Sequence, residues 1–123
     1  MNGFHHKEKG IGILFDNIYL VNGMRTPFGK YCGTLANISP TDLGIYASRA
    51  AMEKANVKAS DIDQLIAANI GQSSTDSYFL PRHISLFAGI PTEVPALMIQ
   101  RICGSGFETI IAGAEQILLG KAE

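Results

Sequence analysis

Three short apolar runs alternate with helical patterns along the chain, and this alternation restricts the fold more than any other feature. The runs cover 17–24, 65–70 and 96–102, and each of them predicts a β-strand. The run over 65–70 is almost continuously apolar, which favours a strand that is covered on both faces. Alternating strands and helices imply parallel strands joined by helical crossovers. The sequence therefore predicts an α/β fold with the order strand, helix, strand, helix, strand, helix.

The first helix has recognisable signals at both ends. Ser39 is the predicted N-cap, Pro40 suits the first helical position, and Asp42 completes a capping box with Ser39. Asn56 suits the left-handed position that ends a helix. The apolar residues between these ends recur at helical spacing, and they are Leu43, Tyr46, Ala47, Ala50, Ala51 and Ala55.

Two further helices are expected. A short one over 81–88 stops at Gly89, and a long one begins just after Cys103 and runs to about Leu119, where Gly120 closes it. Apolar side chains cover most of the circumference of the long helix, namely Phe107, Ile110, Ile111, Ala114, Ile117 and Leu118. A helix that is apolar nearly all round is typical of the interior of a larger protein.

Composition excludes several classes of function. The 123 residues carry a net charge of −1, so the basic surface of a nucleic-acid-binding protein is not expected. No apolar run approaches the length of about 18 residues that a membrane-spanning helix needs. Two cysteines far apart in sequence make neither a zinc motif nor a disulfide framework. We expect a polar leader over 1–15, a folded segment over 16–123 and, without an Arg-rich transit pattern, a cytoplasmic location.

The segment 101–106, Arg-Ile-Cys-Gly-Ser-Gly, carries the most specific chemical signal. It predicts a strand that turns sharply into a helix, with the thiol of Cys103 at the helix N-terminus. Unpaired N–H groups and the helix dipole favour a negative charge there, and the thiolate is the nucleophilic form of cysteine. The same N–H groups suit an oxyanion, and Gly104 and Gly106 allow a substrate to approach the backbone. Cys103 is thus a candidate nucleophile, although a buried core cysteine fits the same pattern.

Three other residues compete for a chemical role. Ser105 is a rival nucleophile, but it lacks the Gly-x-Ser-x-Gly frame of a hydrolase, and we interpret it as a helix-capping residue. His83 would form a cysteine-hydrolase pair with Cys103 if the two side chains came within hydrogen-bond distance. Otherwise His83 is expected on the short helix, capping or solvated, and Cys32 is expected to be an ordinary loop thiol.

Four segments share the pattern of one protein family: Arg25-Thr26-Pro27-Phe28-Gly29-Lys30, Ser39-Pro40-Thr41-Asp42-Leu43-Gly44, Leu80-Pro81-Arg82-His83 through Ala88-Gly89-Ile90-Pro91, and Val94-Pro95-Ala96 leading to Arg101-Ile102-Cys103-Gly104-Ser105-Gly106. Through them, residues 17–123 resemble the start of the thiolase family. The resemblance implies a thiolase-like fold of which this chain is the opening β-α-β-α-β-α portion of the first five-stranded half, incomplete on its own. Residues 16–123 are then the first part of the N-terminal domain, and Cys103 is the residue that becomes acylated.

The resemblance also implies an activity. A thiolase transfers acyl groups between CoA thioesters in fatty acid metabolism, by Claisen condensation or by thiolysis of a 3-ketoacyl-CoA. Acyl-CoA and acetyl-CoA are the substrates, no cofactor is implied, and the complete enzymes are homo-oligomers, either dimers or tetramers. The family's other catalytic groups are an asparagine, the histidine of a Gly-His-Pro motif and the cysteine of a Cys-x-Gly motif. None of these motifs occurs in the 123 residues, so we expect the isolated chain to be inactive. The alternative is a truncated thiolase-like subunit that binds a partner without catalysis.

Overall fold

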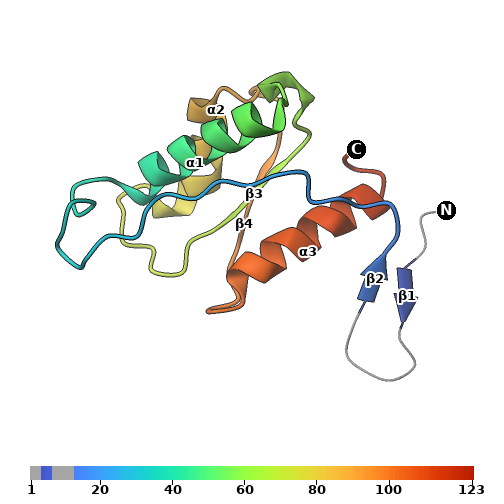
Figure 1. The fold of residues 1–123 in the computed structure, drawn as a ribbon, viewed down its shortest axis with the longest axis horizontal. Coiled ribbons are helices and arrows are strands. Elements are labelled where there is room, and N and C mark those ends of the chain that lie inside the picture. Colours follow the sequence, from blue (N-terminus) through green and yellow to red (C-terminus); the bar gives the residue numbers. More distant parts are fainter. Residues whose placement is uncertain (1–3, 7–12) are drawn as a thin grey trace.

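The computed structural model describes residues 4–6 and 13–123 (Figure 1). In chain order its helices and strands are β1 (Phe4–His6), β2 (Ile13–Phe15), α1 (Pro40–Ala55), β3 (Leu65–Ala68), α2 (Leu80–Ala88), β4 (Ala96–Ile99) and α3 (Ser105–Leu118), with short 3₁₀ turns at Ala59–Asp61 and Ser77–Phe79. Strands β3 and β4 pair in parallel, with Leu65 opposite Ala96 and Ala68 opposite Ile99. Helix α2 lies between them in sequence, so the predicted α/β class with a helical crossover is confirmed.

Helices lie on both faces of the β3–β4 pair (Figure 1). On one face α1 packs against α2, and the buried core there consists of Ile45, Leu80 and Ile84, packed against Leu65 and Ala67 of β3. The intervening residue of β3, Ile66, lines a cavity of about 530 Å³ together with Ile110 and Ala114 of α3. Side chains alternate between the faces of a strand, so β3 contributes to both layers.

The signals at the ends of the first helix are confirmed. The Ser39 hydroxyl oxygen accepts a hydrogen bond from the Asp42 N–H (3.0 Å) and donates one to the Asp42 carboxylate (2.8 Å). Asn56 has a left-handed backbone with φ 54°, directly after α1. Gly89 likewise has a left-handed backbone, with φ 93°, directly after α2. Both helices therefore end where the sequence predicted.

The prediction of a strand over 17–24 is wrong. These residues form no strand, and the apolar side chains of Tyr19, Leu20 and Val21 are each more than 70% exposed. A strand exists only where a neighbour accepts its hydrogen bonds, and among the described residues β3 pairs with β4 and not with this segment. The segment instead contacts the end of α1, where the Asn22 side-chain amide donates to the Lys54 carbonyl oxygen (3.2 Å).

The range predicted as a polar leader contains the short antiparallel pair β1–β2. Residues 1–3 and 7–12 of that range lie outside the described residues. The division of the chain into 1–15 and 16–123 therefore stays a prediction. Within the described ranges, no helix combines the length and the apolar character needed to cross a bilayer.

Helix α3 begins and ends close to the predicted positions, and its burial inside a larger protein stays a prediction. Phe107 is 76% exposed and Ile110 is 49% exposed, whereas Ala112 and Ala114 are buried against the rest of the chain. The third strand is also shorter than predicted and ends at Ile99, and the left-handed φ of 48° at Ile102 is incompatible with a strand that reaches this residue.

Candidate active site

Cys103 lies in the turn that joins β4 to α3, as the sequence predicted. Two backbone hydrogen bonds close this turn, from the Gly104 N–H to the Arg101 carbonyl (3.0 Å) and from the Ser105 N–H to the Ile102 carbonyl (3.2 Å). The Cys103 thiol is free and exposed. Cys103 is therefore not part of the core that the described residues form.

The start of α3 provides hydrogen-bond donors beside this thiol. Gly104 is the N-cap, and the first hydrogen bond inside the helix runs from the Glu108 N–H to the Gly104 carbonyl (3.0 Å). The N–H groups of Gly106 and Phe107 precede that bond, so they belong to the donors that a helix leaves unpaired at its N-terminus. A side chain built on Gly106 would meet nothing within 4 Å. The backbone there is open to an approaching molecule.

His83 does not pair with Cys103. Its Nδ1 atom lies 2.9 Å from a carboxylate oxygen of Asp76, and its ring stacks on Phe79 and meets the edge of Phe87. Among the residues that the structure describes, none forms a hydrogen bond with the Cys103 sulfur. The cysteine-hydrolase alternative therefore lacks its base.

Ser105 is not the helix cap that the sequence suggested. The N-cap position belongs to Gly104, and no side chain caps the helix there. Ser105 is 1% exposed, and its hydroxyl group hydrogen-bonds to the turn that precedes the helix. A buried hydroxyl whose proton is already donated to a carbonyl is also a poor rival nucleophile.

Cys32 matches the interpretation of an ordinary loop thiol. It is exposed and has a left-handed backbone with φ 55°. The adjacent turn closes through a hydrogen bond from the Gly33 N–H to the Lys30 carbonyl (2.8 Å). Within the described part of the chain, no three side chains of the metal-binding types gather at this loop or elsewhere.

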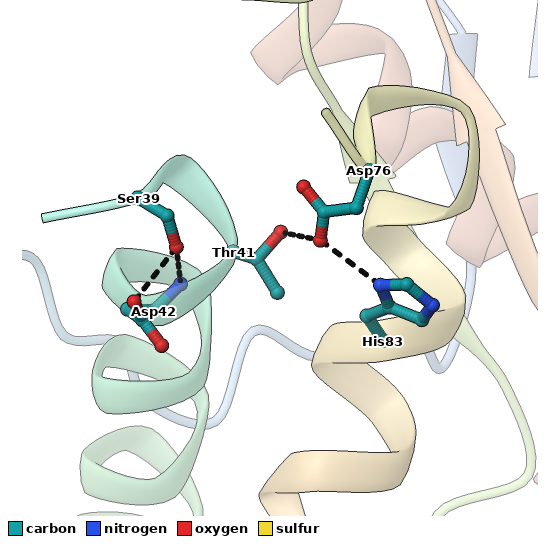
Figure 2. A network of polar contacts seen from close by, with 5 residues as sticks. All are labelled: Ser39, Thr41, Asp42, Asp76 and His83. Atoms are coloured by element: carbon teal, nitrogen blue, oxygen red, sulfur yellow. Dashed lines mark hydrogen bonds and ion pairs between the residues drawn. The ribbon is translucent and has the colours of Figure 1, made fainter. Parts of the chain in front are cut away.

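A polar network that the sequence did not reveal joins the two helices of the core (Figure 2). The Thr41 hydroxyl group, in the first turn of α1, donates to the Asp76 carboxylate (2.6 Å), and His83 of α2 contacts the same oxygen. The hydrogen bond from Thr41, followed by that from His83, holds the pKa of Asp76 far below its ordinary value. No spacing rule links positions 41, 76 and 83, so only the folded chain brings them together.

We expect Asp76→Asn to lower the free energy of unfolding by about 1–2 kcal/mol at neutral pH, because a charge-assisted pair of hydrogen bonds is weakened at a partly exposed site. Folding lowers the pKa of this carboxyl group. Its contribution is therefore complete above the ordinary value of 3.8 and is lost as the pH falls through the depressed folded-state pKa. Urea unfolding from neutral to acidic pH should show the two stabilities converging in acid. A Glu115→Gln control should stay parallel to the original chain, and a constant gap for Asp76→Asn would contradict the assignment.

Residues 18–123 match the family model described as "Thiolase, N-terminal domain". The chain belongs to the thiolase family. Human mitochondrial 3-ketoacyl-CoA thiolase is 43% identical over 110 residues, which cover 89% of this chain and 28% of that protein. An acetyl-CoA acetyltransferase of Schizosaccharomyces pombe is 34% identical over 111 residues, covering 86% and 27%. A crystal structure of the human mitochondrial enzyme in complex with CoA matches with a TM-score of 0.82 at 45% identity, over 84% of this chain and 26% of that one.

These matches confirm the predicted family and the predicted thiolase-like fold. This thiolase-family chain spans about a quarter of the length of the relatives it matches. The matched region begins at residue 18, next to the start at residue 17 that the sequence motifs indicated.

The predicted cytoplasmic location is contradicted. The bovine, human and mouse relatives, at 42–44% identity, are all named as mitochondrial 3-ketoacyl-CoA thiolases. The prediction rested on the composition of the first 15 residues, which lack the arginines of a transit peptide. The absence of an Arg-rich transit pattern from 15 residues does not decide where a protein is located. The names of these relatives are the stronger observation, and they do not support the cytoplasm.

Proposed function

We propose that Cys103 is the acyl-accepting nucleophile of a thiolase and that this chain supplies the segment that carries it. The exposed position of the thiol at the turn into α3 is the observation that carries the proposal. A helix N-terminus favours a negatively charged group, and the thiolate is the reactive form of cysteine. Family membership supports the same role, because the named relatives are 3-ketoacyl-CoA thiolases and acetyl-CoA acetyltransferases.

In the direction of thiolysis, the Cys103 thiolate attacks the C3 carbonyl carbon of a 3-ketoacyl-CoA and produces a tetrahedral oxyanion. Collapse of this intermediate breaks the C2–C3 bond, and the electron pair leaves with C2 as the enolate of acetyl-CoA, which then takes up a proton. The acyl group stays on Cys103 as a thioester until the thiolate of free CoA attacks it and regenerates Cys103. Condensation follows the same steps in reverse. Covalent catalysis of this kind divides a difficult carbon–carbon cleavage into two easier steps.

The N–H groups at the start of α3 have a part in this scheme. Those of Gly106 and Phe107 precede the first intrahelical bond, so they are free to stabilise negative charge near Cys103. CoA is the expected acyl carrier, in line with the human relative whose structure contains it. The proton transfers on C2 need a positioned base and acid in addition to these groups.

A chimera tests the proposal directly. Residues 18–123 replace the matching segment of human mitochondrial 3-ketoacyl-CoA thiolase, to which this chain has a TM-score of 0.82. We expect the chimera to cleave acetoacetyl-CoA in the presence of CoA, measured as formation of acetyl-CoA. A folded chimera without thiolase activity would contradict the proposal and favour the alternative of a binding subunit without catalysis.

We expect the isolated 123-residue chain to cleave acetoacetyl-CoA no faster than the buffer does. General acid–base groups typically contribute about 10²–10⁴-fold to a rate, and no side chain of the described residues forms a hydrogen bond with the Cys103 sulfur. The measurement is the same acetyl-CoA assay, with the chimera as the positive control. Turnover that disappears in Cys103→Ser would show that the chain itself holds the missing groups.

A further inference from the structure

The turn that presents Cys103 contains a residue in an unfavourable backbone conformation. Ile102 has a φ of 48°. The left-handed region is uncommon for any residue with a side chain and is a clear outlier for a β-branched one. The other non-glycine residues in this region of the described chain are Asn17, Cys32, Asn56 and Gln72, and none of them is β-branched. Such a conformation persists only where the surrounding structure holds it.

The Ser105 hydroxyl group holds both sides of this residue. Its oxygen accepts a hydrogen bond from the Arg101 N–H (2.7 Å), and its proton is donated to the Ile102 carbonyl oxygen (2.8 Å). The Ser105 N–H donates to the same carbonyl (3.2 Å). Ser105 is 1% exposed, so water does not compete strongly for these bonds.

The Ile102 carbonyl belongs to the peptide bond that leads into Cys103, so hydrogen bonds to this carbonyl restrain the plane of the peptide from which Cys103 follows. We propose that Ser105 is a positioning residue that keeps the Cys103 thiol exposed beside the N-terminus of α3. This inference rests on the proposed role of Cys103 as the nucleophile. Ser105 acts through the backbone of 101–103, and its own hydroxyl group is not expected to touch the substrate.

The rate at which iodoacetamide alkylates each thiol tests the inference on the complete 123-residue chain. Peptide-resolved mass spectrometry follows Cys103 and Cys32 separately in one sample. In Ser105→Ala we expect the Cys103 rate to fall about three- to fivefold, the effect expected for a negative charge displaced from a helix terminus. The Cys32 rate should not change, because Cys32 lies in a separate loop.

Two further variants separate positioning from general stability. Thr109→Ala is the matched control, because it removes another hydroxyl-to-carbonyl bond at the start of α3, to Gly106 (2.8 Å), and leaves the turn intact. Ser105→Thr keeps the hydroxyl group and should restore the Cys103 rate. If Ser105→Ala keeps its helix content by circular dichroism and the Cys103 rate of the original chain, the inference is wrong.

If Ser105→Ala does not fold, amide hydrogen exchange of the original chain tests whether the Ser105 hydroxyl group holds the backbone before Cys103. The Arg101 N–H should then be protected in the original chain, because it donates to the buried hydroxyl group, and rapid exchange there would overturn the inference. These measurements do not depend on thiolase activity. If the chimera is inactive while the Arg101 N–H is protected and the Cys103 alkylation rate depends on Ser105, the role of Cys103 as the nucleophile is rejected. If the chimera is active and the Arg101 N–H exchanges rapidly, only the role of Ser105 is rejected.

Discussion

Cys103→Ser should lower the thiolysis rate of the chimera by at least roughly 10³-fold, since loss of a nucleophile removes the covalent route altogether. Serine has almost the same size and preserves the turn, so the loss reports chemistry and not folding. Its hydroxyl group is barely ionised at neutral pH, whereas cysteine has an accessible thiolate form. The measurement is kcat for acetyl-CoA formation at saturating acetoacetyl-CoA and CoA.

Cys32→Ser is the matched control for this prediction. Cys32 is also a free, exposed thiol, but it lies in the loop before α1 and far along the chain from α3. The control variant should retain the activity of the chimera within about twofold, which is within the effect of an ordinary surface substitution. Equal activity of the chimera and Cys103→Ser, with both folded, would end the assignment of Cys103 as the nucleophile.

Features that were predictable from the sequence depend on residues close together in the chain. The capping box of Ser39 and Asp42 and the left-handed end at Asn56 are local, and both were found where they were expected. The turn into α3 is local as well, because a strand, a cysteine and two glycines occur within a few residues. Local rules therefore located both the first helix and the candidate nucleophile.

The structural features that the sequence did not predict depend on contacts between segments that are distant in the chain. The apolar run over 17–24 has the composition of a strand, but a strand also needs a partner, which the described residues do not provide. The contacts of Asp76 with Thr41 and His83 join positions up to 35 residues apart, and no sequence pattern predicts them. Ser105 was interpreted as a helix-capping residue, but its hydroxyl group hydrogen-bonds to the turn before the helix.

Gly44→Ala should lower the free energy of unfolding by up to about 2 kcal/mol, although alanine normally stabilises a helix relative to glycine. Gly44 lies in α1 where this helix crosses α2. A Cβ atom there would clash with the Ile84 Cδ1 atom and lie 2.8 Å from Cγ1. Ile84 is 5% exposed and belongs to the buried cluster, so its displacement would disturb the packing against Ile45 and Leu80. Overpacking of a core costs about 1–3 kcal/mol, and the gain in helix propensity of about 1 kcal/mol offsets only part of a cost above the lower limit of that range.

Urea unfolding measures this effect, and Gly113→Ala is its matched control. A Cβ atom on Gly113 of α3 would meet nothing within 4 Å, so this variant should gain up to about 1 kcal/mol from helix propensity alone. The two Gly→Ala changes are thus expected to shift stability in opposite directions.

The contact with Ile84 is tested by adding Ile84→Val, which removes the Cδ1 atom itself. Ile84→Val alone should cost about 0.5–1.5 kcal/mol, as is usual for a buried isoleucine. In the Gly44→Ala background the same change should cost less, or even stabilise, because it relieves the clash, and a coupling energy of at least about 0.5 kcal/mol is expected. If the changes in unfolding free energy caused by Gly44→Ala and Ile84→Val are strictly additive, α1 and α2 are not in close contact at this crossing. The description of α1 and α2, the helices that carry Thr41 and His83 of the polar network, as tightly packed would then be wrong.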